Sequence, residues 1–72
     1  MPYPGAIRQA LGLTERESET AMLLAGGLDL PTIAHRLQLG LGTVRNHLKS
    51  IFGKTGTRRQ GELVALLGAL QL

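Results

Sequence analysis

The chain lacks cysteine and tryptophan, and its only aromatic residues are Tyr3 and Phe52. Without cysteine it can form neither a disulfide bond nor a thiolate zinc site. Its longest uninterrupted apolar run, residues 21–28, includes two glycines and is far shorter than the ~20 residues that cross a bilayer. No charged and then apolar leader precedes that run, so we expect neither export nor membrane insertion.

β-Branched residues are also scarce. Ile and Val supply 5 of the 31 hydrophobic residues, whereas Leu supplies 15 and Ala supplies 7. Leu and Ala favour helices, while sheets draw on β-branched and aromatic residues, so the composition predicts an all-α fold. A chain of 72 residues has room for one domain with one small core.

Acidic residues are few and unevenly placed. The net charge is +3, but residues 1–35 carry −2 and residues 36–72 carry +5. A sign difference of this size in so short a chain indicates one face suited to a polyanion.

Residues 1–12 contain two prolines and are predicted to form an extension or linker stub, with one short helical turn over residues 6–11. Residues 13–72 are predicted to form the domain. Thr14 and Glu17 have the spacing of a capping box, so the first firm helix is expected to begin at Thr14. Glycines at 26–27 are expected to end this helix.

Asp29 is a good N-cap for a second, short helix, which we expect Gly40 to end. A third helix is predicted over residues 41–55, closed by Gly56. Its apolar stripe is spaced at i, i+4, i+7, i+8 and i+11 and consists of Val44, Leu48, Ile51, Phe52 and Thr55. The opposite side carries Arg45, Asn46, Lys49 and Ser50. A fourth helix is predicted to begin near residues 58–60. Its apolar stripe is wider than packing against the core alone would require.

Two short helices joined by a glycine-containing turn, the second with a basic outer face, form the helix-turn-helix pattern. A helix fits the major groove of B-DNA, and residues near its N-terminal half reach base edges. In this chain Arg45 can contact guanine with two hydrogen bonds, Asn46 can pair with adenine, and Lys49 can contact guanine or phosphate. The Thr43 hydroxyl is placed to contact phosphate.

Residues 13–67 resemble the LuxR/FixJ/GerE-type DNA-binding domain of bacterial transcription regulators. The matches are, in order, LTERE at 13–17, LLAGGL at 23–28, IAHRL at 33–37, TVRNHL at 43–48 and KTG at 54–56. The resemblance implies a four-helix domain in which the third helix is the recognition helix and the fourth helix forms a dimer.

The outward face and the resemblance together give eight candidate DNA-binding residues: Thr43, Arg45, Asn46, His47, Lys49, Ser50, Lys54 and Arg58. The candidate dimer interface is the apolar stripe of the fourth helix: Leu63, Val64, Leu66, Leu67 and Leu70. An alternative is that all five belong to the core, because a chain this short has few leucines to spare.

Several positions depart from the family pattern, among them Leu30 and Pro31, which replace the polar pair that usually follows the cap of the second helix. Gly40 stands where the family usually has a capping serine, so it offers no side-chain cap. Gln60 stands where arginine is common, which removes one possible ion pair to Glu17.

The chain is therefore expected to bind double-stranded DNA as a homodimer in the bacterial cytoplasm, at the nucleoid, with RNA polymerase as a further candidate partner. We expect no enzymatic activity, because neither His35 nor His47 has a nucleophile or carboxylate dyad beside it in the sequence. We also expect no cofactor and no metal. The competing interpretation is a helical protein-interaction module, similar to a sigma-factor domain or an adaptor, that does not bind DNA by itself.

Overall fold

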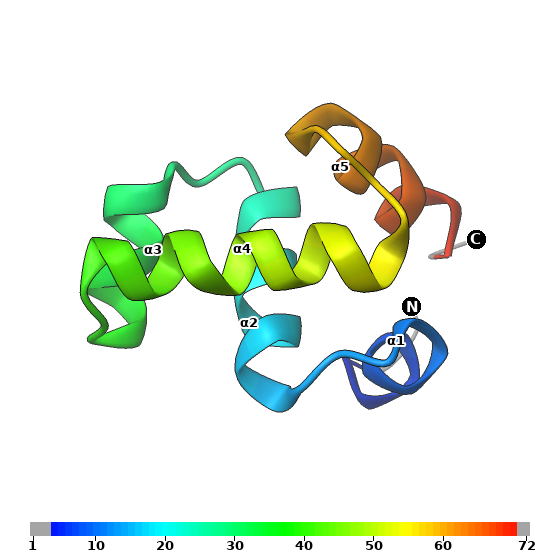
Figure 1. Ribbon diagram of the computed structural model, residues 1–72, viewed down its shortest axis with the longest axis horizontal. Coiled ribbons are helices and arrows are strands. Elements are labelled where there is room, and N and C mark those ends of the chain that lie inside the picture. The colour runs from blue at the N-terminus through cyan, green and yellow to red at the C-terminus, as the bar shows by residue number, and fades with distance from the viewer. Residues whose placement is uncertain (1–3, 71–72) are drawn as a thin grey trace.

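The computed structural model describes residues 4–70, with side chains from Arg8 onward. Within that range the chain folds into five helices and no strands, so the predicted all-α class is confirmed (Figure 1). The helices are α1 (Pro4–Leu11), α2 (Glu15–Ala25), α3 (Leu30–Leu37), α4 (Leu41–Thr55) and α5 (Gln60–Ala69). None of these described helices is long and apolar enough to span a membrane.

Helix α2 is the centre of the packing, because it contacts each of the other four helices. Figure 1 shows α4 crossing in front of α2, with α3 at one end of α4 and α5 at the other. The core that these helices enclose consists of Leu13, Ala21, Leu24, Ile33, Ala34, Val44, Ile51, Leu63 and Leu67. Every helix from α2 to α5 contributes to this single core, which suits the size of the chain.

The predicted capping box at the start of α2 is confirmed. The Glu17 backbone N–H donates to Thr14 Oγ1 over 3.1 Å, and the Thr14 backbone N–H donates to Glu17 Oε1 over 2.9 Å. The predicted N-cap of α3 is also confirmed, since Asp29 Oδ1 accepts from the Thr32 backbone N–H over 2.9 Å. Both caps satisfy donors that a helix start leaves without an internal partner.

The end of α3 differs from the prediction. The helix ends at Leu37, and Gln38, not Gly40, adopts the left-handed conformation, at φ 56°. The Leu39 N–H donates to the Ala34 carbonyl and the Gln38 N–H to the His35 carbonyl, which is the Schellman pattern. Half-buried Leu39 packs against the core, so burial of this leucine stabilises the turn despite a non-glycine residue. Gly40 is the N-cap of α4 and, as expected, makes no side-chain cap.

The first residues also differ from the prediction. Where residues 1–12 were expected to be irregular with one short turn, Pro4–Leu11 is a helix that Gly12 ends at φ 69°. Proline is well suited to the first turn of a helix, because its fixed φ is already helical. Helix α1 packs against α2, and half-buried Leu11 contacts the core. Residues 1–3 lie outside the described residues, and a domain boundary after residue 12 stays a prediction.

Two glycines near the end of α4 allow a matched test of the fold. At Gly53 an added Cβ would meet open space inside a regular helix, so Gly53→Ala is expected to stabilise the protein by about 0.5–1 kcal/mol. Gly56 has open space too but lies at φ +70°, so Gly56→Ala is expected to destabilise it by about 1–2 kcal/mol. Thermal unfolding of both variants measures the difference. Shifts of the same sign would contradict the assigned helix end.

Candidate nucleic-acid interface

The α3 and α4 helices, joined by residues 38–40, form the predicted helix-turn-helix pair. Val44 and Ile51 on α4 are fully buried, and Leu48 and Phe52 are half-buried against the same core. Because seven residues make close to two helical turns, Val44 and Ile51 lie on one side of α4. The opposite side must therefore face solvent.

That outward side carries Arg45, Asn46 and Lys49, and all three side chains are exposed as predicted. Among the described residues, neither Arg45 nor Lys49 makes an ion pair. Thr43, in the first turn of α4, is exposed as well. The N-terminal half of α4 thus exposes to solvent two cations without an ion-pair partner among the described residues, an amide and a hydroxyl, which are the groups that contact base edges and phosphates.

A second row on α4 lies on its flank rather than its outward side. His47, Ser50 and Lys54 are spaced at i, i+3 and i+7, so they form one stripe along the helix. His47 and Ser50 are half-buried, and Nδ1 of His47 is buried without a hydrogen-bond partner among the described residues. With its Nδ1 buried, His47 has only its other ring nitrogen, Nε2, to offer to a ligand.

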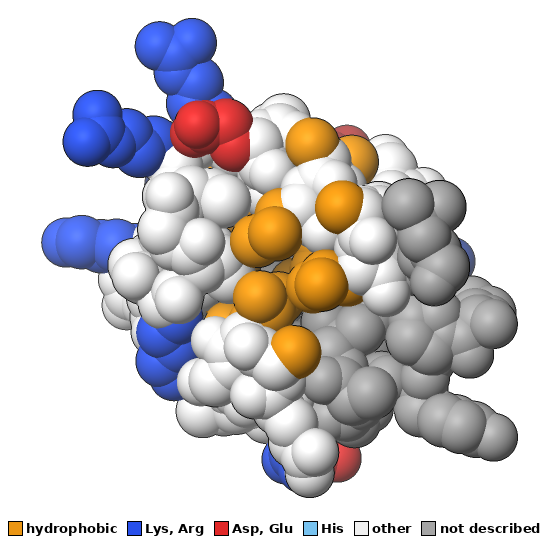
Figure 2. Space-filling view, turned by 90° about the vertical axis from the view of Figure 1, so that its right-hand side faces the viewer, with side chains coloured by type: hydrophobic (Ala, Val, Ile, Leu, Met, Phe, Trp, Pro, Cys, Tyr) orange, Lys and Arg blue, Asp and Glu red, His pale blue; other side chains and the backbone are white. Residues whose placement is uncertain are grey.

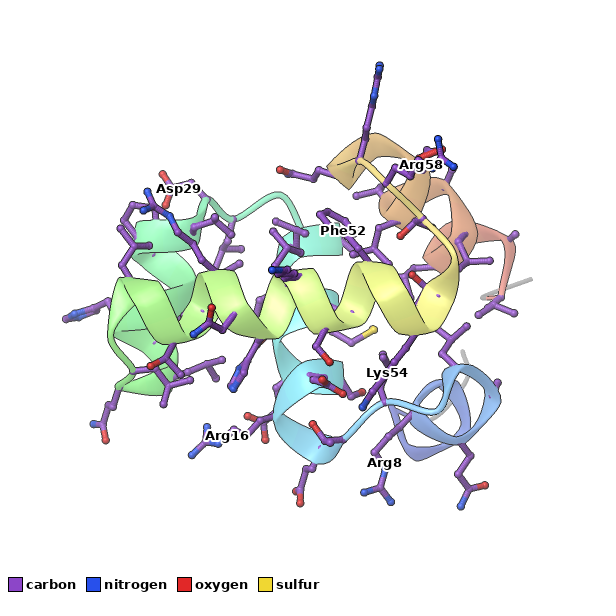
Figure 3. All side chains as sticks on the ribbon, in the orientation of Figure 1. Arg8, Arg16, Asp29, Phe52, Lys54 and Arg58 are labelled. Carbon is purple, nitrogen blue, oxygen red and sulfur yellow. The ribbon has the colours of Figure 1, made fainter. Side chains whose placement is uncertain are left out.

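The flank row meets the start of α2 at Glu17. Lys54 Nζ donates to Glu17 Oε1 over 2.7 Å, and the Glu17 side chain is only 6% exposed. Figure 3 shows Lys54 projecting from α4 toward the beginning of α2. Burial alone would raise the pKa of Glu17, but hydrogen bonds from Lys54, Ser50 and the Thr14 backbone and the Lys54 charge lower it to about 2. The carboxylate therefore stays ionised and joins two helices.

This contact was not foreseen from the sequence. The departure at Gln60 was expected to deprive Glu17 of a possible ion pair, yet Lys54 on the neighbouring helix supplies one. Ser50 was predicted on the outward side with Arg45 and Lys49, but it is half-buried on the flank, where it helps to lower the pKa of Glu17. The signal available was the capping-box role of Glu17, which already required its carboxylate to point back along α2.

Arg58 lies in the turn that leads into α5, with an exposed side chain (Figure 3). Its backbone N–H donates to Glu62 Oε1 over 2.8 Å, so Glu62 holds the start of α5. Arg58 lies beyond the C-terminal end of α4 and is not brought together with Arg45 and Lys49.

The five candidate dimer residues divide into two groups. Leu63 and Leu67 are 0% exposed and belong to the core, so their assignment to a dimer interface was wrong: a fully enclosed side chain cannot touch a partner. Val64 and Leu70 are 36% and 37% exposed, and Leu66 is half-buried. Figure 2 shows hydrophobic side chains gathered on the face near the C-terminus, with Lys and Arg side chains along one edge.

The comparisons with known proteins agree with this geometry. Residues 11–67 match the family model described as bacterial regulatory proteins, luxR family. The chain belongs to the luxR family. Membership confirms the resemblance and the fold expected from the sequence, and it makes the domain a DNA-binding helix-turn-helix domain of transcription regulation. The alternative of an interaction module that does not bind DNA is correspondingly disfavoured.

Relatives in this luxR family include an HTH-type transcriptional regulator encoded in the exeN 3′ region of Aeromonas salmonicida, 42% identical over 67 residues. The HTH-type regulator GfsR of Streptomyces halstedii is 40% identical over 53 residues, and the transcriptional regulatory protein LnrK of Bacillus subtilis is 42% identical over 50. These alignments cover 85%, 74% and 69% of the chain. The chain spans only 34%, 22% and 23% of the relatives. No solved structure matches.

The Glu17 contact predicts an acid-sensitive fold. Because the pKa of Glu17 falls from 4.5 to about 2 on folding, its stabilisation is present above pH 4.5 and is lost as the pH falls toward 2. Glu17→Gln is expected to remove this contribution, on the order of 3 kcal/mol, from the pH dependence of the unfolding free energy. Urea unfolding at pH 7 and pH 3 measures about 2 kcal/mol of this contribution, because the folded-state pKa lies near 2 and the rest of the loss occurs below pH 3.

The matched control is Glu15→Gln, which removes the same charge from an exposed position two residues earlier. This variant should keep the wild-type difference between the two pH values. If Glu15→Gln and Glu17→Gln flatten the pH dependence equally, the Lys54 contact does not carry the effect.

Proposed function

We propose that the outward side of α4 enters the major groove of double-stranded DNA and reads its sequence there. The observation that supports this most strongly is the pair of exposed cations, Arg45 and Lys49, which have no anionic partner among the described residues and flank Asn46. Arg45 and Lys49 contact guanine and Asn46 contacts adenine, as their donor and acceptor geometry favours. This is sequence-specific binding by direct readout.

Contacts to the DNA backbone set the register. Thr43 is exposed in the first turn of α4, where its hydroxyl and the helix N-terminus favour a phosphate. Arg58 supplies a more distant phosphate contact, and His47 donates from Nε2 because its Nδ1 is enclosed. Lys54 serves DNA binding indirectly, by holding α4 against α2 through its ion pair with Glu17, and Ser50 lies beside it on the flank of α4. Binding is salt-dependent, with log K falling by about 0.9 per unit of log[salt] for each phosphate neutralised.

In this proposal the contact of a two-fold dimer is formed by exposed Val64 and half-buried Leu66 of α5 and by exposed Leu70, which caps the end of α5. The hydrophobic area of Figure 2 supports it, since exposed apolar side chains gathered on one face favour association. In this dimer the two α4 helices are related by a two-fold axis, so they bind paired half-sites in successive major grooves. The domain acts at the bacterial nucleoid in the cytoplasm, and RNA polymerase stays a predicted partner without an assigned surface.

Readout by Arg45 predicts a position-specific defect. Arg45→Ala is expected to cost about 1–3 kcal/mol on the preferred site and to relax the preference at one base pair, because a bidentate contact is lost. The control Arg8→Ala removes the same charge from α1 and should leave the preference unchanged. Selection of bound duplexes from a random pool, followed by gel shifts, measures both. An equal loss on every sequence would reassign Arg45 to the phosphates.

The dimer contact predicts different outcomes for neighbouring residues of α5. Val64→Asp places a charge on an exposed residue, so the monomer should stay folded while binding to paired half-sites falls toward the affinity for one half-site. Leu67→Asp buries a charge in the core and should unfold the domain. Circular dichroism and analytical ultracentrifugation with DNA separate the two. Unchanged half-site cooperativity in Val64→Asp would exclude this face.

A further inference from the structure

Helix α2 has a second side that the proposed DNA interface does not use, where Met22 and Leu23 pack against the edge of the core and stay half-buried. Glu17 faces α4 through its pair with Lys54, and Glu15 and Glu19 each lie about 200° around the helix from it. On that far side a groove of about 630 Å³ lies between α1, α2 and α3. None of the described α4 residues lines this groove, so a molecule bound in it would leave α4 available to bind DNA.

The groove has an apolar floor with charges on its walls. Met22 and Leu23 of α2 and Leu37 of α3 are half-buried along the floor. Glu15 and Glu19, one turn apart, line the groove from α2, and Arg8 lines it from α1. Arg8 lies outside the 11–67 range that matches the family, so this groove includes a wall that the family domain does not supply.

We propose that this groove docks an amphipathic helix of a partner protein. An apolar groove between three helices can accept an amphipathic helix by its i, i+3, i+4 and i+7 residues. The partner helix is apolar on the docking side, carries Lys or Arg toward Glu15 and Glu19, and carries an acidic residue toward Arg8. The wall charges fix this polarity, because the reversed helix places like charges together.

Glu19 already forms an exposed ion pair with Arg16, and a partner helix would have to replace this pair to bind Glu19. Arg16 Nη1 lies 3.1 Å from Glu19 Oε2, but both side chains are exposed at 55% and 42%, so the pair is weak and opens readily to a new cation. Figure 3 shows Arg8 and Arg16 at the same edge of the molecule. The apolar floor therefore supplies most of the affinity, and the walls select the direction of the helix.

This role is compatible with DNA binding, since the groove and the outward side of α4 lie on opposite sides of α2 and α4. Simultaneous binding rests on the proposed function, whereas binding of the helix alone does not. A regulator with both surfaces can hold a second protein at its DNA site.

The test uses two synthetic helical peptides of about 16 residues with the same leucine stripe. One carries lysines on the flank that meets Glu15 and Glu19 and glutamates on the flank that meets Arg8, and the other has the two flanks exchanged. Titration into the ¹⁵N-labelled 72-residue protein is expected to shift the amides of the groove. The first peptide should bind about tenfold more tightly. The double variant Glu15→Lys/Glu19→Lys should reverse the preference between the two peptides. If that variant does not fold, the double variant Glu15→Gln/Glu19→Gln replaces it and should abolish the preference.

Several outcomes would overturn the groove proposal, and one would overturn the proposed function instead. Equal binding of both peptides, no binding, or shifts confined to α5 would exclude a polarity-selective groove. If the amide signals of the groove residues shift with increasing protein concentration in the absence of peptide, the groove binds a second copy of the chain. Peptide binding by a protein that fails to bind duplex DNA would refute the proposed function and leave the groove intact.

Discussion

Burial of one side of α4 against α2 is the constraint on which the rest of the structure depends. Val44 and Ile51 are fully enclosed there, so the rotation of α4 about its own axis is determined by core packing and not by the ligand. Once that rotation is set, the helical repeat alone puts Arg45, Asn46 and Lys49 outward. The set of residues in the proposed DNA interface is thus a consequence of core packing, and a change in the core would alter which side of α4 faces outward.

The Glu17 carboxylate strengthens this constraint at the other end of α4. One buried carboxylate accepts from the Thr14 backbone, which begins α2, and from Lys54, which lies in the last turn of α4. Breaking the Lys54 contact would leave the buried carboxylate without a cation, an arrangement that is costly in a low-dielectric surrounding. The pair therefore fixes the two helices at one point of contact. Helix α2 uses its inner side for this purpose and leaves its outer side, with Met22 and Leu23, for the groove.

Local features of the fold could be predicted from the sequence because they depend on residues close together. The capping box of Thr14 and Glu17 and the Asp29 cap are interactions over three residues, and the bounds of α4 follow from its apolar repeat. The end of α3 could not be predicted in this way. Gln38 takes a left-handed conformation because Leu39 is drawn into the core, which is a tertiary cause.

In the candidate site too, features set by residues close in sequence could be predicted and features set by tertiary contacts could not. The outward residues of α4 follow from periodicity, whereas the partner of Lys54 is 37 residues away in the sequence and no local pattern marks it. In α5 the repeat identifies an apolar helix but does not tell a core leucine from an exposed one. Leu63 and Leu67 are enclosed only because α2 lies against that side of α5.

The most direct test of the account is a titration of the ¹⁵N-labelled protein with a duplex that contains its selected site. The account predicts that amides of residues 41–50 shift or broaden first, while those of the outer side of α2 stay unchanged. A duplex that binds tightly and perturbs α5 or α2 without affecting residues 41–50 would show that α4 is not the helix that meets DNA.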